Sequence, residues 1–172
     1  MKILLSLITL IVAITSCSKS SINNKPLPDY YIYADIDGVP TLYDTSANFS
    51  FNEPYPPVHQ GVIMQAAKAP NIHADNINIS ISSTYPENLI PEGSYVDTPN
   101  AQNYYAYVVY DSSFKVYQSL SSKPNATTVN ITLINDSLIQ GTFNSKVIFF
   151  NPSGDSTIHY LTNGKFRLKF EN

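Results

Sequence analysis

The side chains that could hold a metal or transfer protons are few and widely separated in this sequence. Its three histidines are His59, His73 and His159, and none belongs to a ligand pattern such as H-E-x-x-H. His73 and Asp75 could offer two ligands to one ion, but exposed histidines explain them more simply. A single cysteine excludes metal sites built on cysteine pairs. We therefore predict no metal site and no cofactor.

A pair of carboxylates is the other arrangement with catalytic potential. Asp35 and Asp37 lie two residues apart, so in a strand both side chains would share one face. Such pairs can hydrolyse glycosidic bonds, although two acids next to Gly38 also fit a solvated turn. No G-x-S-x-G nucleophile motif is present. We predict no catalytic residue and a protein that is not an enzyme, with a hydrolase lacking recognisable motifs as the least favoured alternative.

Tyrosine is the most distinctive residue type, with 13 copies and no tryptophan. Flat aromatic rings on a sheet can stack on sugar rings or anchor a protein partner. Tyrosine is also a good strand former, so the same residues could simply cover the rim of a core. The sequence predicts a ligand or partner patch at five positions: Tyr31, Tyr33, Tyr104, Tyr105 and Tyr107.

These residues lie on segments with the period-2 pattern of half-buried strands. Residues 30–37 alternate in this way, and Ile77, Ile79 and Ile81 alternate with asparagine and serine. Residues 61–68 are ambiguous between helix and strand, and we predict a strand because the neighbouring segments are strands. About nine or ten short strands, with no helix after the first residues, predict an all-β fold. We expect an antiparallel β-sandwich, with a β-barrel as the alternative.

The last part of the chain has the strongest hairpin pattern. Residues 158–162 and 165–170 are joined by Asn163-Gly164, a pair that suits a type I′ turn because both residues accept positive φ. Phe166, Leu168 and Phe170 are then expected to face the core, while the intervening basic side chains face water.

The first residues have the features of an export signal. Lys2 precedes a short apolar run that is too short to cross a bilayer as a helix. Residues 14–17, I-T-S-C, resemble a bacterial lipobox, in which cleavage before the cysteine leaves it as the acylated first residue. We predict a signal peptide at residues 1–16 and lipidation of Cys17, with chains such as palmitate holding the protein at a membrane. The alternatives are an ordinary secretory leader or a buried thiol.

The rest of the chain has the size and composition of one exported domain. We predict that residues 17–28 comprise the lipidated cysteine and a flexible tether with two prolines. The eleven tether residues 18–28 span about 18 Å as a flexible chain, and residues 29–172 form a single domain. The net charge is −3 and only 13% of residues are charged. A nucleic-acid partner is excluded, since that function needs a basic surface.

Four short segments occur in a recognisable order: A-D-I-D-G from Ala34, I-P-E-G-S-Y from Ile90, I-Q-G-T-F from Ile139 and T-N-G-K-F from Thr162. Together they resemble a class of small Bacteroidota lipoproteins of unknown function. The resemblance implies an all-β fold and a cell-envelope location at the outer membrane, and it carries no catalytic residues. No acidic cluster follows Cys17, which favours the periplasmic face over the cell surface.

Two serines lie in patterns that resemble Bacteroidota O-glycosylation sites. Ser137 follows Asp136, and Ser156 follows Asp155, both at expected turns where an enzyme could reach them. We predict Ser137 and Ser156 as modification sites.

For the whole protein we predict a lipid-anchored, non-catalytic binding or accessory module of the cell envelope. Its partners would be the membrane, through Cys17, and either an envelope protein or a glycan. The alternative is an envelope structural or assembly lipoprotein without a small ligand.

Overall fold

The computed structural model describes residues 26–52, 61–70, 75–83, 90–98, 104–119, 126–151 and 156–171. These residues form eleven β-strands: β1 (Tyr31–Ile36), β2 (Val39–Tyr43), β3 (Thr45–Asn52), β4 (Gly61–Ala67), β5 (Asn76–Ser83), β6 (Gly93–Val96), β7 (Tyr104–Ser112), β8 (Lys115–Ser119), β9 (Thr127–Ile134), β10 (Leu138–Phe150) and β11 (Ser156–Phe170). The predicted all-β class is confirmed. No helix long and apolar enough to cross a membrane occurs in the part of the chain that the structure describes.

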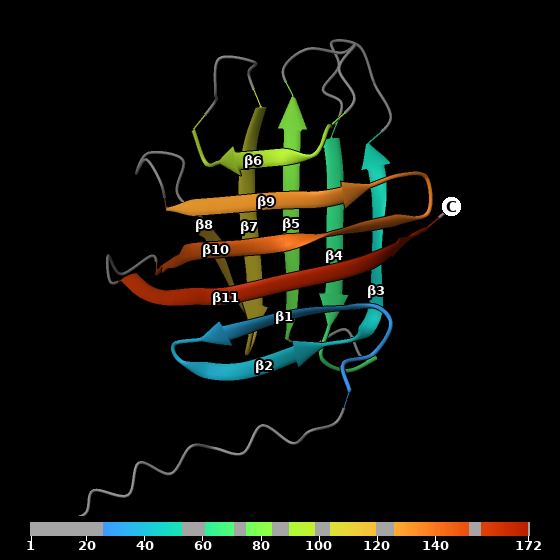
Figure 1. The fold of residues 1–172 in the computed structure, drawn as a ribbon. Helices are drawn as coiled ribbons and strands as arrows, with labels where there is room; N and C mark the ends of the chain where they lie inside the picture. Colours follow the sequence, from blue (N-terminus) through green and yellow to red (C-terminus); the bar gives the residue numbers. More distant parts are fainter. Residues whose placement is uncertain are drawn as a thin grey trace, which may run out of the picture.

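The strands form one mixed sheet that folds into two layers. Its order is β2-β1-β11-β3-β4-β5-β7-β8-β10-β9-β6. Figure 1 shows β3, β4, β5 and β7 lying behind β6, β9, β10, β11, β1 and β2, which run across them. The apolar sides of the two layers face each other, and the core lies between them. The back layer comprises β3, β4, β5, β7 and β8, and the front layer comprises the other six strands.

The two layers are connected by pairing at both ends of the back layer. Val147 and Ile148 of β10 pair with Ser119 and Gln118 of β8. At the other end, β11 pairs with β3 in parallel over Lys169–Asn48 and Phe170–Phe49. Because β10 also pairs with β11 along most of its length, the hydrogen-bonded pairs run in a complete circuit. The structure therefore has two crossed layers, as in a sandwich, together with pairing at both connections between them.

Alternation along the strands decides which side chains enter the core. Successive residues of a strand point to opposite faces, and β5 has strictly alternating burial that places Ile77, Ile79 and Ile81 inside. Segment β4 is a strand, as predicted, because its apolar residues also alternate and pair with those of β5. The largest fully buried side chains come from both layers: Tyr43, Phe49, Phe143, Phe166, Ile32, Met64, Ile77, Ile79, Ile81, Ile139, Leu161 and Leu168.

The predicted hairpin at Asn163-Gly164 is wrong. Residues 156–170 form the continuous strand β11, which pairs with β10 on one side and β1 on the other. Asn163 keeps the positive φ that the turn prediction required, at 53°, but it produces a bulge at which both pairings change register. The strand continues through Asn163 because its residues form hydrogen bonds with β1 and β10, and these long-range pairings replace the local turn. Phe166 and Leu168 are buried as predicted, and Phe170 packs at the core margin.

Candidate functional site

The five predicted tyrosines lie in three different environments. Tyr31 and Tyr33 are on the outer face of β1 in the front layer, half-buried. Tyr105 and Tyr107 are on the outer face of β7 in the back layer, also half-buried. Tyr104 is 6% exposed and belongs to the core. The residues therefore do not form one patch.

The prediction that Tyr104 belongs to a surface patch is thus wrong. It precedes Tyr105 directly, so its side chain points to the opposite face of β7. There it packs edge-on against the ring of Tyr95, with ring centroids 5.7 Å apart. Adjacent tyrosines on one regular strand divide between core and surface, which reduces the patch on β7 to Tyr105 and Tyr107.

The front-layer tyrosines have charged neighbours. The hydroxyl of Tyr33 donates a hydrogen bond of 2.9 Å to Oδ1 of Asp35, and burial together with this carboxylate raises the pKa of Tyr33. Tyr31 lines a hollow of about 290 Å³ that also contains Lys165 and Arg167. Strand β11 thus gives the front face a basic character beside these two rings.

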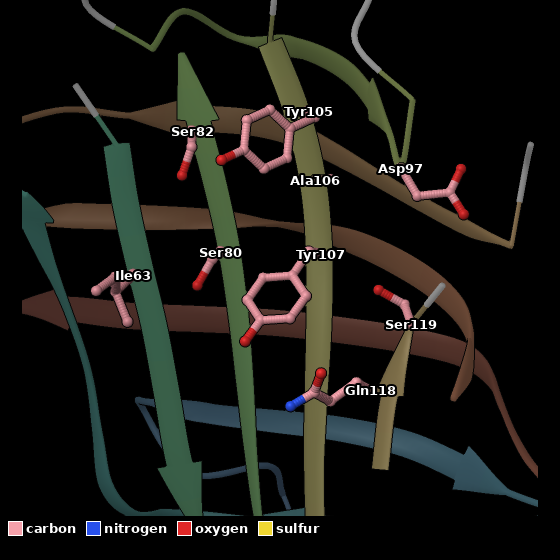
Figure 2. Close-up of a pocket in the computed structure, with 9 residues that line it drawn as sticks. All are labelled: Ile63, Ser80, Ser82, Asp97, Tyr105, Ala106, Tyr107, Gln118 and Ser119. Atoms are coloured by element: carbon pink, nitrogen blue, oxygen red, sulfur yellow. The ribbon is translucent and has the colours of Figure 1, made fainter. Parts of the chain in front are cut away.

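The back-layer tyrosines line a groove with a volume of about 610 Å³. Figure 2 shows it from the outer side of the back layer, with both phenol rings lying over the sheet between β5 and β7. Its lining comes from several strands and strand ends: Ile63, Ser80, Ser82, Asp97, Tyr105, Ala106, Tyr107, Gln118 and Ser119. None of these residues is basic.

Strand register explains why rings and hydroxyls meet in this groove. Ser82 is paired with Tyr105 and Ser80 with Tyr107, so each serine lies directly across from a ring on the same face. Gln118 of β8 adds an exposed amide beside Tyr107 (Figure 2). Burial and the nearby charge of Asp111 raise the pKa of Tyr107, so its hydroxyl stays protonated and can donate a hydrogen bond. The groove combines aromatic faces with uncharged hydrogen-bonding groups.

One end of the groove is fixed by buried polar groups. Asp97 is 2% exposed, and its Oδ2 accepts a hydrogen bond of 3.2 Å from the backbone N–H of Thr127. Ser119 Oγ accepts one of 3.0 Å from the backbone N–H of Val108. These bonds connect the end of β6 with β9, and β7 with β8, so both side chains have a structural role as walls of the groove.

The candidate carboxylate pair is engaged in holding β1 against β11. Asp35 accepts bonds from Tyr33 and from Nδ2 of Asn163, the latter at 2.8 Å. Asp37 Oδ1 accepts a 2.8 Å bond from the backbone N–H of Tyr160, and its Oδ2 is 2.6 Å from Nδ1 of His159. Each carboxylate thus has its own partners, an arrangement that fits a structural role at the β1–β2 turn.

These contacts also change the pKa of Asp37. Burial alone would raise its pKa, but the bond from Tyr160 and the bond and charge of His159 outweigh that effect. The pKa of Asp37 is therefore lowered from its ordinary 3.8. The ring of His159 packs edge-on against the ring of Tyr117, with centroids 4.5 Å apart. The Asp37–His159 pair therefore lies where β11 approaches the β7–β8 hairpin.

No group of three or more potential metal ligands occurs among the residues that the structure describes. His59 and His73 lie outside these residues, as do Cys17 and the signal peptide at residues 1–16. The lipidation of Cys17 stays a prediction.

Both predicted O-glycosylation serines are exposed. Ser137 lies in the turn between β9 and β10, where its N–H and hydroxyl both donate to Oδ1 of Asn135 at 3.0 Å. Ser156 begins β11. Their accessibility is compatible with modification, which stays a prediction.

Most of the groove could not be identified from the sequence. The tyrosine pattern singled out Tyr105 and Tyr107 but not Ser80, Ser82 or Gln118. The alternation of serine and asparagine with isoleucine in residues 76–82 indicated a polar outer face, but the neighbours of that face depend on sheet order.

Comparison with known proteins gives no assignment. No family model matches the chain, and no curated protein and no solved structure is significantly similar to it. The groove is therefore the main guide to function.

Proposed function

We propose that the protein is a non-catalytic, lipid-anchored envelope module that binds a glycan in the groove of the back layer. The observation that carries this proposal is the combination of Tyr105 and Tyr107 with hydroxyl and amide groups and no basic residue in the groove lining. Aromatic faces can pack on the apolar C–H face of a sugar, while the rim satisfies its hydroxyl groups.

The spacing of the rings supports a sugar chain rather than a single small ligand. Tyr105 and Tyr107 are two positions apart on one strand, which places them about 7 Å from each other. Two rings at this distance offer consecutive platforms along β7. The facing Ser80 and Ser82 provide hydrogen-bonding groups at the same spacing.

A neutral glycan fits the groove better than a charged one. The lining has no lysine or arginine to pair with a carboxylate or sulfate, and its charged member, Asp97, would repel an anion. The basic side chains Lys165 and Arg167 lie on the opposite layer, away from the groove.

The test is binding of the purified full-length chain to an array of neutral glucans, mannans and xylans beside acidic polygalacturonate and hyaluronan. We expect a neutral polysaccharide to bind, and Tyr107→Ala or Tyr105→Ala to weaken binding about tenfold or more, which corresponds to ~1.4 kcal/mol. Tyr31→Ala on the front layer is the matched control and should leave binding unchanged. Binding to no glycan, or equal binding by all three variants, would refute the proposal.

A protein partner is the second candidate, and a different surface favours it. Val39, Ile158 and Tyr160 are exposed apolar side chains near the β1–β2 turn, where Asp37 bonds to Tyr160. Cross-linking in intact cells, with Cys17→Ala as the control for anchoring, would reveal an envelope protein bound there. Loss of such a cross-link in Tyr160→Ala would assign the partner to this surface.

A further inference from the structure

A second hollow lies on the same outer face of the back layer. It has a volume of about 290 Å³ and is lined by Ser46, Gln65, Ala66, Ala67, Asn76, Asn78 and Asp111. The polar members of this set are one hydroxyl, three amides and one carboxylate. Like the groove, the hollow contains no basic residue.

The groove and the hollow are consecutive parts of one surface. Strands β5 and β7 run through both, with Ser80 paired to Tyr107 in the groove and Asn76 paired to Asp111 in the hollow. Alternation places these residues on the same face. From Tyr105 to Asp111 the distance along β7 is roughly 20 Å at the usual rise per residue, which is room for several sugar residues.

Asp111 is the unusual group in the hollow. Its Oδ1 is enclosed and has no hydrogen-bond partner among the residues that the structure describes, whereas buried polar atoms are nearly always paired. The terminal torsion of an aspartate is soft, so rotation can exchange the two oxygens and present either to a ligand. A carboxylate oxygen turned into the hollow can accept a hydrogen bond from a sugar hydroxyl.

The amides around Asp111 are held in position. Nδ2 of Asn78 donates to Oδ1 of Asn76 at 3.3 Å, and Asn78 is paired with Gln65 across β4 and β5. These residues form a row of amides beside the carboxylate. Such a row can both donate to and accept from sugar hydroxyls.

We infer that groove and hollow together form one extended site for a linear, neutral oligosaccharide that lies along β5 and β7. Sugar rings stack on Tyr105 and Tyr107 at one end, and Asp111 with Asn76 and Asn78 binds hydroxyl groups at the other. This inference rests on the proposed glycan-binding function and adds the length, direction and charge of the ligand.

The test uses the neutral polysaccharide selected by the array, cut into disaccharide, tetrasaccharide and hexasaccharide, with calorimetry on the full-length chain. The disaccharide can occupy only the groove, whereas the hexasaccharide can reach both parts. We expect the hexasaccharide to bind at least tenfold more tightly than the disaccharide. Asp111→Ala should remove most of that gain and leave disaccharide binding unchanged.

Asp136→Ala, the same change at an exposed turn of the front layer, is the matched control and should keep the full gain. Thermal melting verifies that each variant is folded. Equal affinity for all three lengths, or a hexasaccharide that binds Asp111→Ala as tightly as the native chain, would overturn the extended site while leaving the groove proposal standing. If no polysaccharide binds the native chain, both proposals fail.

Discussion

Asp37 shows how one side chain can serve the fold at a position that looks catalytic. Its φ of 50° starts the tight β1–β2 turn, a conformation that aspartate tolerates better than most residues. Its backbone and side chain both bond to Tyr160, and its second oxygen meets His159. The turn is thereby fastened to β11 by three separate contacts.

These contacts predict a pH dependence of stability. The folded-state pKa of Asp37 is lower than 3.8, so the stabilisation is fully present above the unfolded-state value and is lost as the pH falls through the folded-state value. We expect Asp37→Asn to melt at a lower temperature than the native chain at pH 7. The difference should shrink as the solution is acidified below pH 3.8, measured by circular dichroism.

Asparagine tolerates the same backbone conformation and still accepts the bond from Tyr160, so this variant isolates the charge. A difference in melting temperature that stays constant down to the most acidic pH would contradict the role assigned to the carboxylate.

Strands β10 and β11 are joined by two reciprocal contacts between glycine and phenylalanine. Gly141 is paired with Phe166, and Phe143 with Gly164, in the same register. An added Cβ on Gly164 would lie 2.4 Å from the carbonyl oxygen of Phe143 and 2.5 Å from its ring. Each phenylalanine therefore covers the backbone of the opposite glycine. This contact gives a physical reason for the G-x-F segments of the sequence: they are packing elements.

Gly164→Ala should therefore destabilise the protein. The clash with Phe143 must displace a fully buried ring or the β10 backbone, and overpacking of this kind costs about 1–3 kcal/mol. Urea unfolding would measure the loss in the free energy of unfolding.

Gly38→Ala is the comparison, because its Cβ would meet no atom of the described residues within 4 Å, so that the cost there comes from a φ of 83°. A Gly164→Ala variant as stable as the native chain would mean that β10 and β11 leave room for a methyl group between Gly164 and Phe143.

The whole molecule presents two outer faces of different chemistry. The front layer carries Lys165, Arg167 and Lys169 on exposed positions of β11. The back layer carries serine, asparagine, glutamine and tyrosine around the groove and hollow. If Cys17 anchors the protein as predicted, the tether would hold both faces close to the membrane, and a ligand would have to bind there.

The anchor itself gives a prediction for the intact protein. If Cys17 is acylated, each buried CH₂ contributes about 0.8 kcal/mol and two or more chains anchor it stably. The native chain should then fractionate with membranes and show the added acyl mass. Cys17→Ala should be recovered in the soluble fraction without that mass. Equal membrane association of both forms would exclude the lipid anchor.

Several features could be derived from the sequence because they depend on neighbouring residues. Alternation in residues 30–37 and 76–82 identified strands and their buried sides, since side chains of a strand alternate without regard to the partner strand. The Asp37-Gly38 turn is equally local. The same alternation of side chains places Tyr104 on the opposite face of β7 from Tyr105 and Tyr107.

Other features were decided only by the tertiary structure, because they depend on which strands become neighbours. The positive φ of Asn163 suited both a turn and a bulge, and pairing of β11 with β1 and β10 selected the bulge. Tyr31 and Tyr107 have the same strand pattern, yet sheet order places them on opposite layers. Asn76 and Asp111 are far apart in sequence and meet only through the pairing of β5 with β7. The local alternation determined what each strand exposes, and long-range pairing determined which exposed groups lie side by side.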